Sequence, residues 1–396
     1  MVGRRGFVAT ALLIAAGAAS AQDHTAHVGG KPHPQRFALG SSAAVDATGT
    51  IWAVHVDAGR VVIRRASGVG QPWSMPVALS EADERIEADG DARPKIAIGA
   101  SNELYVTWTH PLAKPYTGEI RFTRSIDGGK TFSAPVTVHR DRQQITHRFD
   151  AVAVSQRGQV FVAWIDRRDA VLAKEQGEPD YRGAALYYAV SDDRGASFRG
   201  DFKVGDHSCE CCRIALRPRG DGSMDAMWRH VFEPNVRDHA LAVLAPDGTV
   251  TELRRVTFDD WRIDACPHHG PSVVADGAGT LHAVWFAQSS DGAGAFYGRL
   301  GDGKVDGQRQ LGGVAAEHPD LTAAGDRVVV VWKEFDGTIT RLHAMTSSDR
   351  GATWADHQLA SSGDASGHPQ LLRVGNSFVV FWNTRAEGLT LSAVPP

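Results

Sequence analysis

The chain has 396 residues, of which 42% are hydrophobic and 22% are charged, so it holds enough apolar material for a large core. Its formal net charge of -4 gives no electrostatic reason to bind nucleic acid or an anionic membrane surface, and we expect neither as a partner. The 42 glycines and 10 tryptophans suit many short strands joined by turns. No feature of the sequence names a protein partner.

Residues 1–21 are predicted to be an export signal. The pair Arg4-Arg5 precedes an apolar run from Phe7 to Ala19, and the small residues up to Ala21 form a cleavage pattern. The arginine pair fits either a twin-arginine signal or a general secretory one. The apolar run is too short for a bilayer, and no later run reaches about 18 apolar residues. We therefore predict an exported protein, periplasmic or secreted, with no membrane span.

Residues 22–34 follow as a predicted flexible arm, because they contain Pro and Gly and show no apolar period. The arm carries His24, His27 and His33, which could touch a metal, although a plain polar tail is the simpler interpretation. Residues 35–396 are predicted to form a single folded domain, because no linker interrupts them.

From residue 43 onward a unit repeats, in which a short apolar strand and a turn lead into an alternating strand that ends in Trp. The seven tryptophans at these ends are Trp52, Trp108, Trp164, Trp228, Trp285, Trp332 and Trp382. Their spacing suits four-stranded propeller blades. The last unit contains three strands, and the strand-like segment 35–40 precedes the first. We therefore predict an all-β, seven-bladed β-propeller in which the N-terminal strand completes the last blade.

One turn motif occurs three times, at 125–132, 191–198 and 347–354, and reads S-x-D-x-G-x-[ST]-aromatic. The Asp can bond the N–H groups of its own turn, and the Gly supplies a positive φ. These turn residues are Asp127, Gly129, Asp193, Gly195, Asp349 and Gly351. The motif resembles the Asp-box of the sialidase-like (BNR repeat) β-propellers. That resemblance implies a propeller with structural Asp-boxes, and it makes six blades the alternative count.

The resemblance does not extend to the catalytic residues of sialidases. It would imply an arginine triad, a Tyr paired with Glu, and an Asp acid/base, with the first arginine in an aromatic-Arg-Ile-Pro motif. Here the corresponding region reads Arg36-Phe37-Ala38-Leu39, and no Tyr can be assigned a Glu partner. A sialidase-like glycoside hydrolase or carbohydrate-binding propeller therefore stays an alternative, a protein–protein scaffold is a second one, and catalysis is left open.

Propeller topology sorts the remaining polar residues by face. The segments that enter each inner strand share one face with the loops after each Trp, and the Asp-boxes lie on the opposite face. All four cysteines fall in two of these entry segments. The candidate metal ligands are Cys209, Cys211, Cys212, Cys266, His268 and His269. Further candidates on the same face are His147, Arg148, Asp166, Arg167, Arg229, His230, His318 and His368.

Two main interpretations of the Cys/His residues stay open, together with a mixed one in which one disulfide accompanies a His-rich metal site. Thiolate and imidazole ligands suit copper or zinc, and the scarcity of carboxylates argues against calcium or magnesium. Alternatively, the four cysteines of an exported protein form disulfides. Our main hypothesis is a copper or zinc site at the channel mouth, used in metal handling or metal-dependent redox chemistry. If the cysteines are bridged, we expect a small-molecule or glycan ligand at the same mouth.

Overall fold

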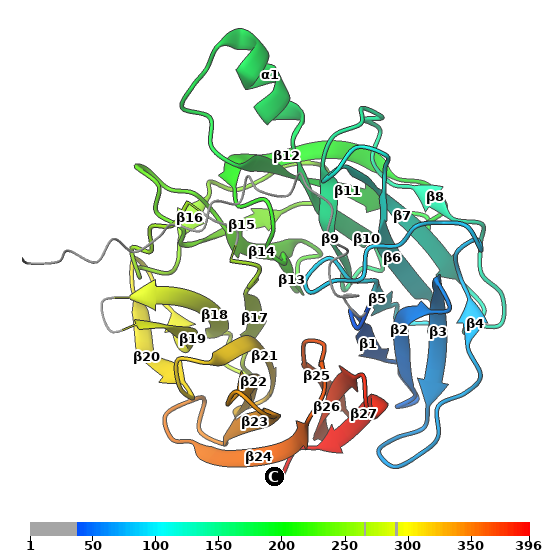
Figure 1. Ribbon diagram of the computed structural model, residues 1–396, viewed down its shortest axis with the longest axis vertical. Helices are drawn as coiled ribbons and strands as arrows, with labels where there is room; N and C mark the ends of the chain where they lie inside the picture. The colour runs from blue at the N-terminus through cyan, green and yellow to red at the C-terminus, as the bar shows by residue number, and fades with distance from the viewer. Residues whose placement is uncertain (1–37, 265–266, 290–291) are drawn as a thin grey trace, which may run out of the picture. The chain divides into compact units, whose positions relative to one another are not determined.

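The computed structural model describes residues 38–264, 267–289 and 292–396. The predicted export signal and arm lie outside these residues. The chain divides into two units after Gln35, and the unit Arg36–Pro396 is a β-propeller whose sheets surround a central axis (Figure 1).

The unit contains seven antiparallel sheets, as predicted, and the six-bladed alternative is wrong. The first three sheets comprise β1 (Ser42–Val45), β2 (Ile51–Asp57), β3 (Arg60–Ala66) and β4 (Val77–Ala78); β5 (Lys95–Ile98), β6 (Leu104–Pro111), β7 (Gly118–Ser125) and β8 (Val136–Thr137); and β9 (His147–Val154), β10 (Val160–Asp166), β11 (Ala184–Ser191) and β12 (Arg199–Ser208). The fourth and fifth comprise β13 (Ala215–Pro218), β14 (Met224–Arg229), β15 (His239–Leu244) and β16 (Arg254–Arg255); and β17 (Ser272–Ala275), β18 (Leu281–Ser289), β19 (Gly292–Leu300) and β20 (Val305–Leu311). The last two comprise β21 (Ala316–Ala324), β22 (Arg327–Phe335), β23 (Thr340–Ser347) and β24 (Ala355–Ser362); and β25 (Gln370–Val374), β26 (Ser377–Thr384) and β27 (Gly388–Ala393).

The seven tryptophans lie on the second strand of each blade, β2, β6, β10, β14, β18, β22 and β26. All seven are buried. They belong to the hydrophobic clusters between neighbouring blades; Trp52 and Trp108, for example, share one cluster across the first and second blades. The first strands pack side by side around the ring, and β25 packs against β1. The repeat read from the sequence is therefore the packing unit of the fold.

The sheet of the last blade has three strands among the described residues. Residues 38–40 of the predicted closing segment belong to no strand, and residues 35–37 of that segment lie outside the described residues. Residues 38–40 lead into the inner strand β1, and the Leu39 carbonyl accepts a hydrogen bond from Asn383 Nδ2 of β26 at 3.1 Å. The start of the described chain is therefore joined to the last blade.

The three Asp-boxes have the structural role that the resemblance implies. In the third box, Asp349 accepts hydrogen bonds from the Ser347 and Thr353 hydroxyls at 2.8 and 2.6 Å and from two backbone N–H groups. The Thr353 hydroxyl in particular holds the pKa of Asp349 at about 2. Gly351 donates its N–H to Ser347 Oγ at 2.8 Å. The boxes follow the third strands, at the end of each blade opposite the inner-strand entries.

Two adjacent glycines in the first Asp-box predict different mutational effects. Gly128 and Gly129 both have positive φ, but a Cβ on Gly129 would lie 2.5 Å from Trp52 Cη2, whereas a Cβ on Gly128 meets nothing within 4 Å. We expect Gly129→Ala to lower the free energy of unfolding by about 2–4 kcal/mol and the matched Gly128→Ala by about 1 kcal/mol. Urea denaturation measures both, and equal losses would contradict this packing role.

The loop after Trp164 contains the single helix of the described residues, α1 (Arg168–Gln176), which the sequence analysis did not predict. The helix ends at Gly177, which adopts a left-handed conformation and returns its N–H to the Ala173 and Lys174 carbonyls. Among residues 38–264, 267–289 and 292–396, no helix has the length and apolar character needed to cross a membrane.

Candidate functional site

The inner-strand entries converge on one buried carboxylate, Asp91. Its Oδ2 accepts hydrogen bonds from the backbone N–H groups of Arg213 at 3.1 Å and Gly270 at 2.9 Å, and its Oδ1 lies 3.3 Å from His368 Nδ1. The Arg213 guanidinium in turn donates to the carbonyls of Gly270, Pro271 and Pro319. Entries of five blades are therefore held together at the channel mouth, as the topology predicted.

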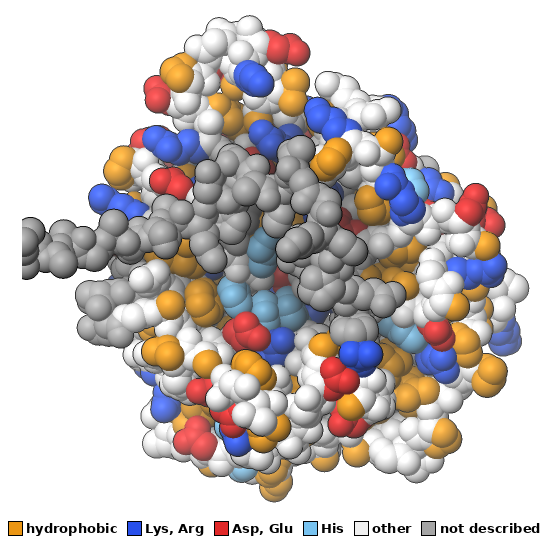
Figure 2. All heavy atoms as spheres, viewed as in Figure 1, with side chains coloured by type: hydrophobic (Ala, Val, Ile, Leu, Met, Phe, Trp, Pro, Cys, Tyr) orange, Lys and Arg blue, Asp and Glu red, His pale blue; other side chains and the backbone are white. Residues whose placement is uncertain are grey.

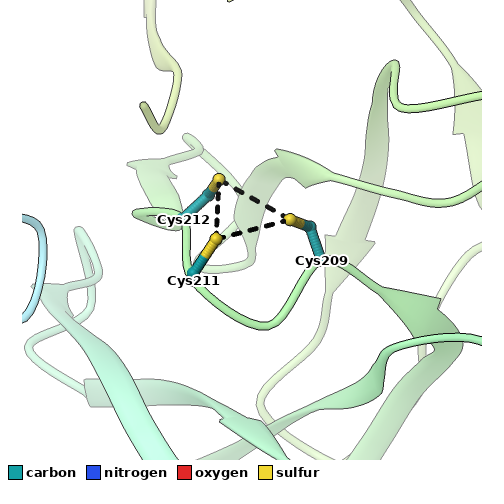
Figure 3. A group of neighbouring side chains, drawn as sticks. All are labelled: Cys209, Cys211 and Cys212. Atoms are coloured by element: carbon teal, nitrogen blue, oxygen red, sulfur yellow. Dashed lines mark hydrogen bonds between the residues drawn. The ribbon is translucent and has the colours of Figure 1, made fainter. Parts of the chain in front are cut away.

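Three cysteines form a compact triangle in the loop between β12 and β13 (Figure 3). The sulfur–sulfur distances are 3.7 Å for Cys209–Cys211, 4.0 Å for Cys211–Cys212 and 3.8 Å for Cys212–Cys209. All three side chains are buried. The loop is fixed to the fourth blade, because Cys209 donates its N–H to the Arg229 carbonyl at 3.0 Å. The fourth cysteine, Cys266, lies outside the described residues.

The triangle has the dimensions of a thiolate metal site. A disulfide needs sulfurs about 2.05 Å apart, so none of these three pairs is bonded. Zinc–thiolate bonds of about 2.3 Å in tetrahedral geometry place neighbouring sulfurs about 3.8 Å apart. The three sulfur–sulfur distances in the triangle are all close to this value. The arrangement thus places three soft ligand atoms at the spacing that one shared ion requires.

Two arginines surround the triangle with positive charge. The Arg237 guanidinium lies 3.7 Å from Cys209 Sγ, and Arg229 is the second positive charge that acts on this thiol. Hydrogen bonds from Cys211 and Cys212, together with these two charges, hold the pKa of Cys209 well below its usual range. Burial raises the pKa of Cys212 instead. One thiolate is therefore favoured before any metal binds.

The candidate histidines form a second, separate group. His368, His318 and His269 stack in a column that ends on Phe286, with ring centroids 3.4, 4.2 and 4.1 Å apart. Glu317 joins the group, since its carboxylate lies 3.5 Å from His318 Nε2. Figure 2 shows histidine side chains gathered in the central hollow of this face, beside acidic and basic ones. Burial lowers the pKa of all three imidazoles, so they are neutral at pH 7.

Two candidates are completely buried at the entry end of the third blade. His147 is fully buried, stacks on His139 at 3.9 Å and bonds the Gly118 carbonyl. Asp166 is fully buried as well, where it accepts hydrogen bonds from Trp164 Nε1 at 2.8 Å and from Arg168. Both residues are parts of a core polar network.

The remaining candidates have partners of their own. Arg148 pairs with Glu87, and Arg167 lies 3.4 Å from Glu210. Buried Arg229 donates to three backbone carbonyls, one of them that of His269 at 3.1 Å. His230 packs 4.5 Å from Phe232, and His268 is exposed near the Phe149 ring.

Sequence reasoning missed Glu317 as a potential ligand and Arg237 as a neighbour of the thiols. The signal for Glu317 was its place next to His318 in an entry segment. The sequence around Arg237 does not indicate that this residue lies next to Cys209, because only folding of the loop brings the two side chains together.

A cavity of about 610 Å³ lies beside α1 on the rim. Tyr181 donates its hydroxyl to Asp206 at 2.9 Å, and Lys203 Nζ lies 2.8 Å from Asp169 Oδ1 and 2.7 Å from Asp206 Oδ1. These two carboxylate oxygens are therefore no more than 5.5 Å apart. The cavity is acidic and lined partly by carboxylates and a tyrosine.

Compared with protein-family models, the sequence matches none of them, and no curated protein matches it either. Solved structures with a similar fold include a PL25 ulvan lyase, at 9% identity and a TM-score of 0.56, with 89% of this chain and 90% of the lyase covered. Another is the GH93 α-L-arabinofuranosidase of Fusarium graminearum, at 14% identity and a TM-score of 0.52, covering 77% and 92%. A Trypanosoma rangeli sialidase also matches, at 11% identity, a TM-score of 0.44 and coverage of 89% and 53%. The expected fold-level resemblance to propellers is confirmed.

Proposed function

We propose that this propeller binds one thiophilic transition-metal ion, copper or zinc, through Cys209, Cys211 and Cys212. The observation that carries the proposal is the sulfur triangle with edges of 3.7–4.0 Å. Three buried thiols this close are unfavourable as three thiolates unless a cation shares their charge. Cys266, predicted as a further ligand, lies outside the described residues and is kept in the proposal as the fourth sulfur.

The residues fit such an ion by type as well as by distance. Soft thiolates select Cu⁺ and Zn²⁺ over Ca²⁺ or Mg²⁺. The bound ion would supply a Lewis-acidic or redox-active centre. This chain's own residues hold the thiol positions through the Arg229 carbonyl and favour the Cys209 thiolate through Arg237. We propose metal handling, or metal-dependent redox chemistry, in an exported protein.

Metal analysis with thiol titration tests this proposal. The protein is purified after export without chelator, its bound metal is measured, and its thiols are titrated before and after chelation in denaturant. We expect about one copper or zinc ion per chain at the thiolate site, with thiols that react only after chelation and unfolding. No metal together with no titratable thiol would mean disulfides and would overturn the proposal.

A glycan-active function is the second candidate, favoured by the cavity beside α1. Its carboxylate oxygens of Asp169 and Asp206 are no more than 5.5 Å apart, so the pair does not exceed the roughly 5–5.5 Å that separates the two carboxyl groups of retaining glycosidases. Proteins of similar fold include an ulvan lyase crystallised with a glycan and an arabinofuranosidase crystallised with arabinobiose. We propose that a sugar chain binds on this rim.

Incubation with ulvan and arabinan, followed by measurement of reducing ends and of unsaturated uronate, tests the second candidate. Turnover that is lost in Asp206→Asn and kept in Glu178→Gln, a change on the rim of the same cavity, would support it. No turnover and no glycan binding would remove it.

A further inference from the structure

A second group of potential metal ligands lies at the channel mouth, apart from the cysteines. His269 precedes the fifth blade, and Glu317 and His318 belong to β21 of the sixth. One ligand atom from each of these residues lies within 4.8 Å of the others. The three cysteine sulfurs form a different group of their own. Two imidazoles and one carboxylate, drawn from two blades, thus lie within 4.8 Å of one another.

The backbone at His318 is held in an unfavourable conformation. Its φ is +51°, a left-handed value that non-glycine residues rarely adopt. The register of β21 against β22 shifts between Glu317 and Asp320, so His318 lies in a β-bulge. Bulges re-aim side chains next to functional sites, and strain of this kind concentrates there. The bulge turns His318 out of the sheet alternation and toward the column of rings.

Stacking fixes the His269 ring between two neighbouring rings, and one of its nitrogen atoms has no hydrogen-bond partner among the described residues. His269 lies between Phe286 and His318, with ring centroids 4.1 and 4.2 Å away. Its Nδ1 is buried and has no hydrogen-bond partner among the described residues. A buried polar nitrogen without a partner is unfavourable, so this imidazole has a free ligand atom. The 3.5 Å between His318 Nε2 and Glu317 Oε2 also leaves room for a shared partner.

We propose that His269, Glu317 and His318 form a second metal site, distinct from the thiolate site, for a divalent ion such as Zn²⁺ or Cu²⁺. Imidazole and carboxylate ligands suit such borderline ions and not Cu⁺. Lys333 lies beside the site, with its Nζ 3.2 Å from Glu317 Oε1. This ammonium balances the carboxylate without a metal and opposes the positive charge of a bound one. The site therefore binds its ion less tightly than the same ligands would without Lys333.

Cobalt binding to the wild-type protein separates the two sites in one experiment. Equilibrium dialysis of metal-free, reduced protein against Co²⁺ counts bound ions, and near-ultraviolet absorption reports thiolate–Co²⁺ charge transfer. We expect an ion without charge transfer in addition to any thiolate-bound ion. This ion stays in Cys211→Ser/Cys212→Ser, so failure of the thiolate proposal leaves this one testable.

Three variants and a control give the proposal a clear outcome. His318→Gln and Glu317→Gln should weaken binding of the second ion by at least about 100-fold and leave the charge-transfer band unchanged. Lys333→Met should tighten binding severalfold, a gain that misfolding cannot imitate. His343→Gln, on β23 of the same blade, should change nothing. Absence of the second ion, or its retention in both His318→Gln and Glu317→Gln, would overturn the proposal.

Discussion

Replacement of Cys211 and Cys212 together by serine is expected to abolish binding of copper or zinc at the thiolate site. Two of the three sulfurs in the triangle are lost, and a hydroxyl is a poor ligand for these soft ions. We expect affinity to fall by at least about 100-fold. Because an ion that binds only the folded protein stabilises it, a free concentration of about 1,000 Kd adds about 4 kcal/mol to wild-type stability. The double variant should lose this increment.

Thermal unfolding with and without Zn²⁺ measures the effect directly. Wild-type protein should melt at a higher temperature with Zn²⁺, whereas the double variant should lose the part of this shift that comes from the thiolate site and keep at most the smaller shift of an ion bound elsewhere. Ser208→Ala is a matched control beside the cluster: it removes the hydrogen bond from Trp228 Nε1 at 3.0 Å but no sulfur, so it should melt lower yet keep the Zn²⁺ shift. A full Zn²⁺ shift in the double variant would contradict the site.

The fold was predictable because each repeat carries short sequence signals that can be recognised without knowing its long-range contacts. A buried Trp on each second strand and an Asp-box turn after three of the third strands mark the blades without knowledge of distant contacts. The closing strand was harder to predict. Pairing of segment 35–40 depends on where the chain meets the last blade, and among the described residues Leu39 contacts that blade through Asn383 of β26.

The sequence predicted which face of the propeller carries the candidate site. It did not predict which side chains on that face lie close enough together to bind one ion. Propeller topology brings the entry segments together, and the structure confirms this through Asp91. Side-chain direction depends on bulges, which the sequence does not reveal. The register of β9 on β10 shifts between Ala163 and Ile165, and His147 turns into the core. The bulge at His318 has the opposite effect and brings that ring into the column with His269.

Asp91→Ala is expected to be the most destabilising single substitution at the channel mouth. The wholly buried carboxylate accepts the N–H groups of Arg213 and Gly270 and lies 3.7 Å from Arg213 Nη1. Its removal leaves two buried donors unpaired and a buried guanidinium without its counter-charge. Breaking a buried pair in this way lowers the free energy of unfolding by about 3–5 kcal/mol. Urea denaturation at pH 7 measures the loss.

The pH dependence of stability separates this electrostatic role from lost packing. Burial alone would raise the pKa of Asp91, but the neighbouring His368 imidazole and the charge of Arg213 hold this pKa well below its usual range. Stability from a group with a lowered pKa is present above the unfolded pKa of about 3.9 and disappears as pH falls through the folded value. The difference in free energy of unfolding between wild-type protein and Asp91→Ala should therefore disappear in strong acid.

Asp326→Ala is the control, because it removes an exposed carboxylate 3.8 Å from Arg350. It should lower the free energy of unfolding by less than about 1 kcal/mol at pH 7. An Asp91→Ala loss as small as this control, or one that does not change with pH, would mean that Asp91 does not hold the blade entries together.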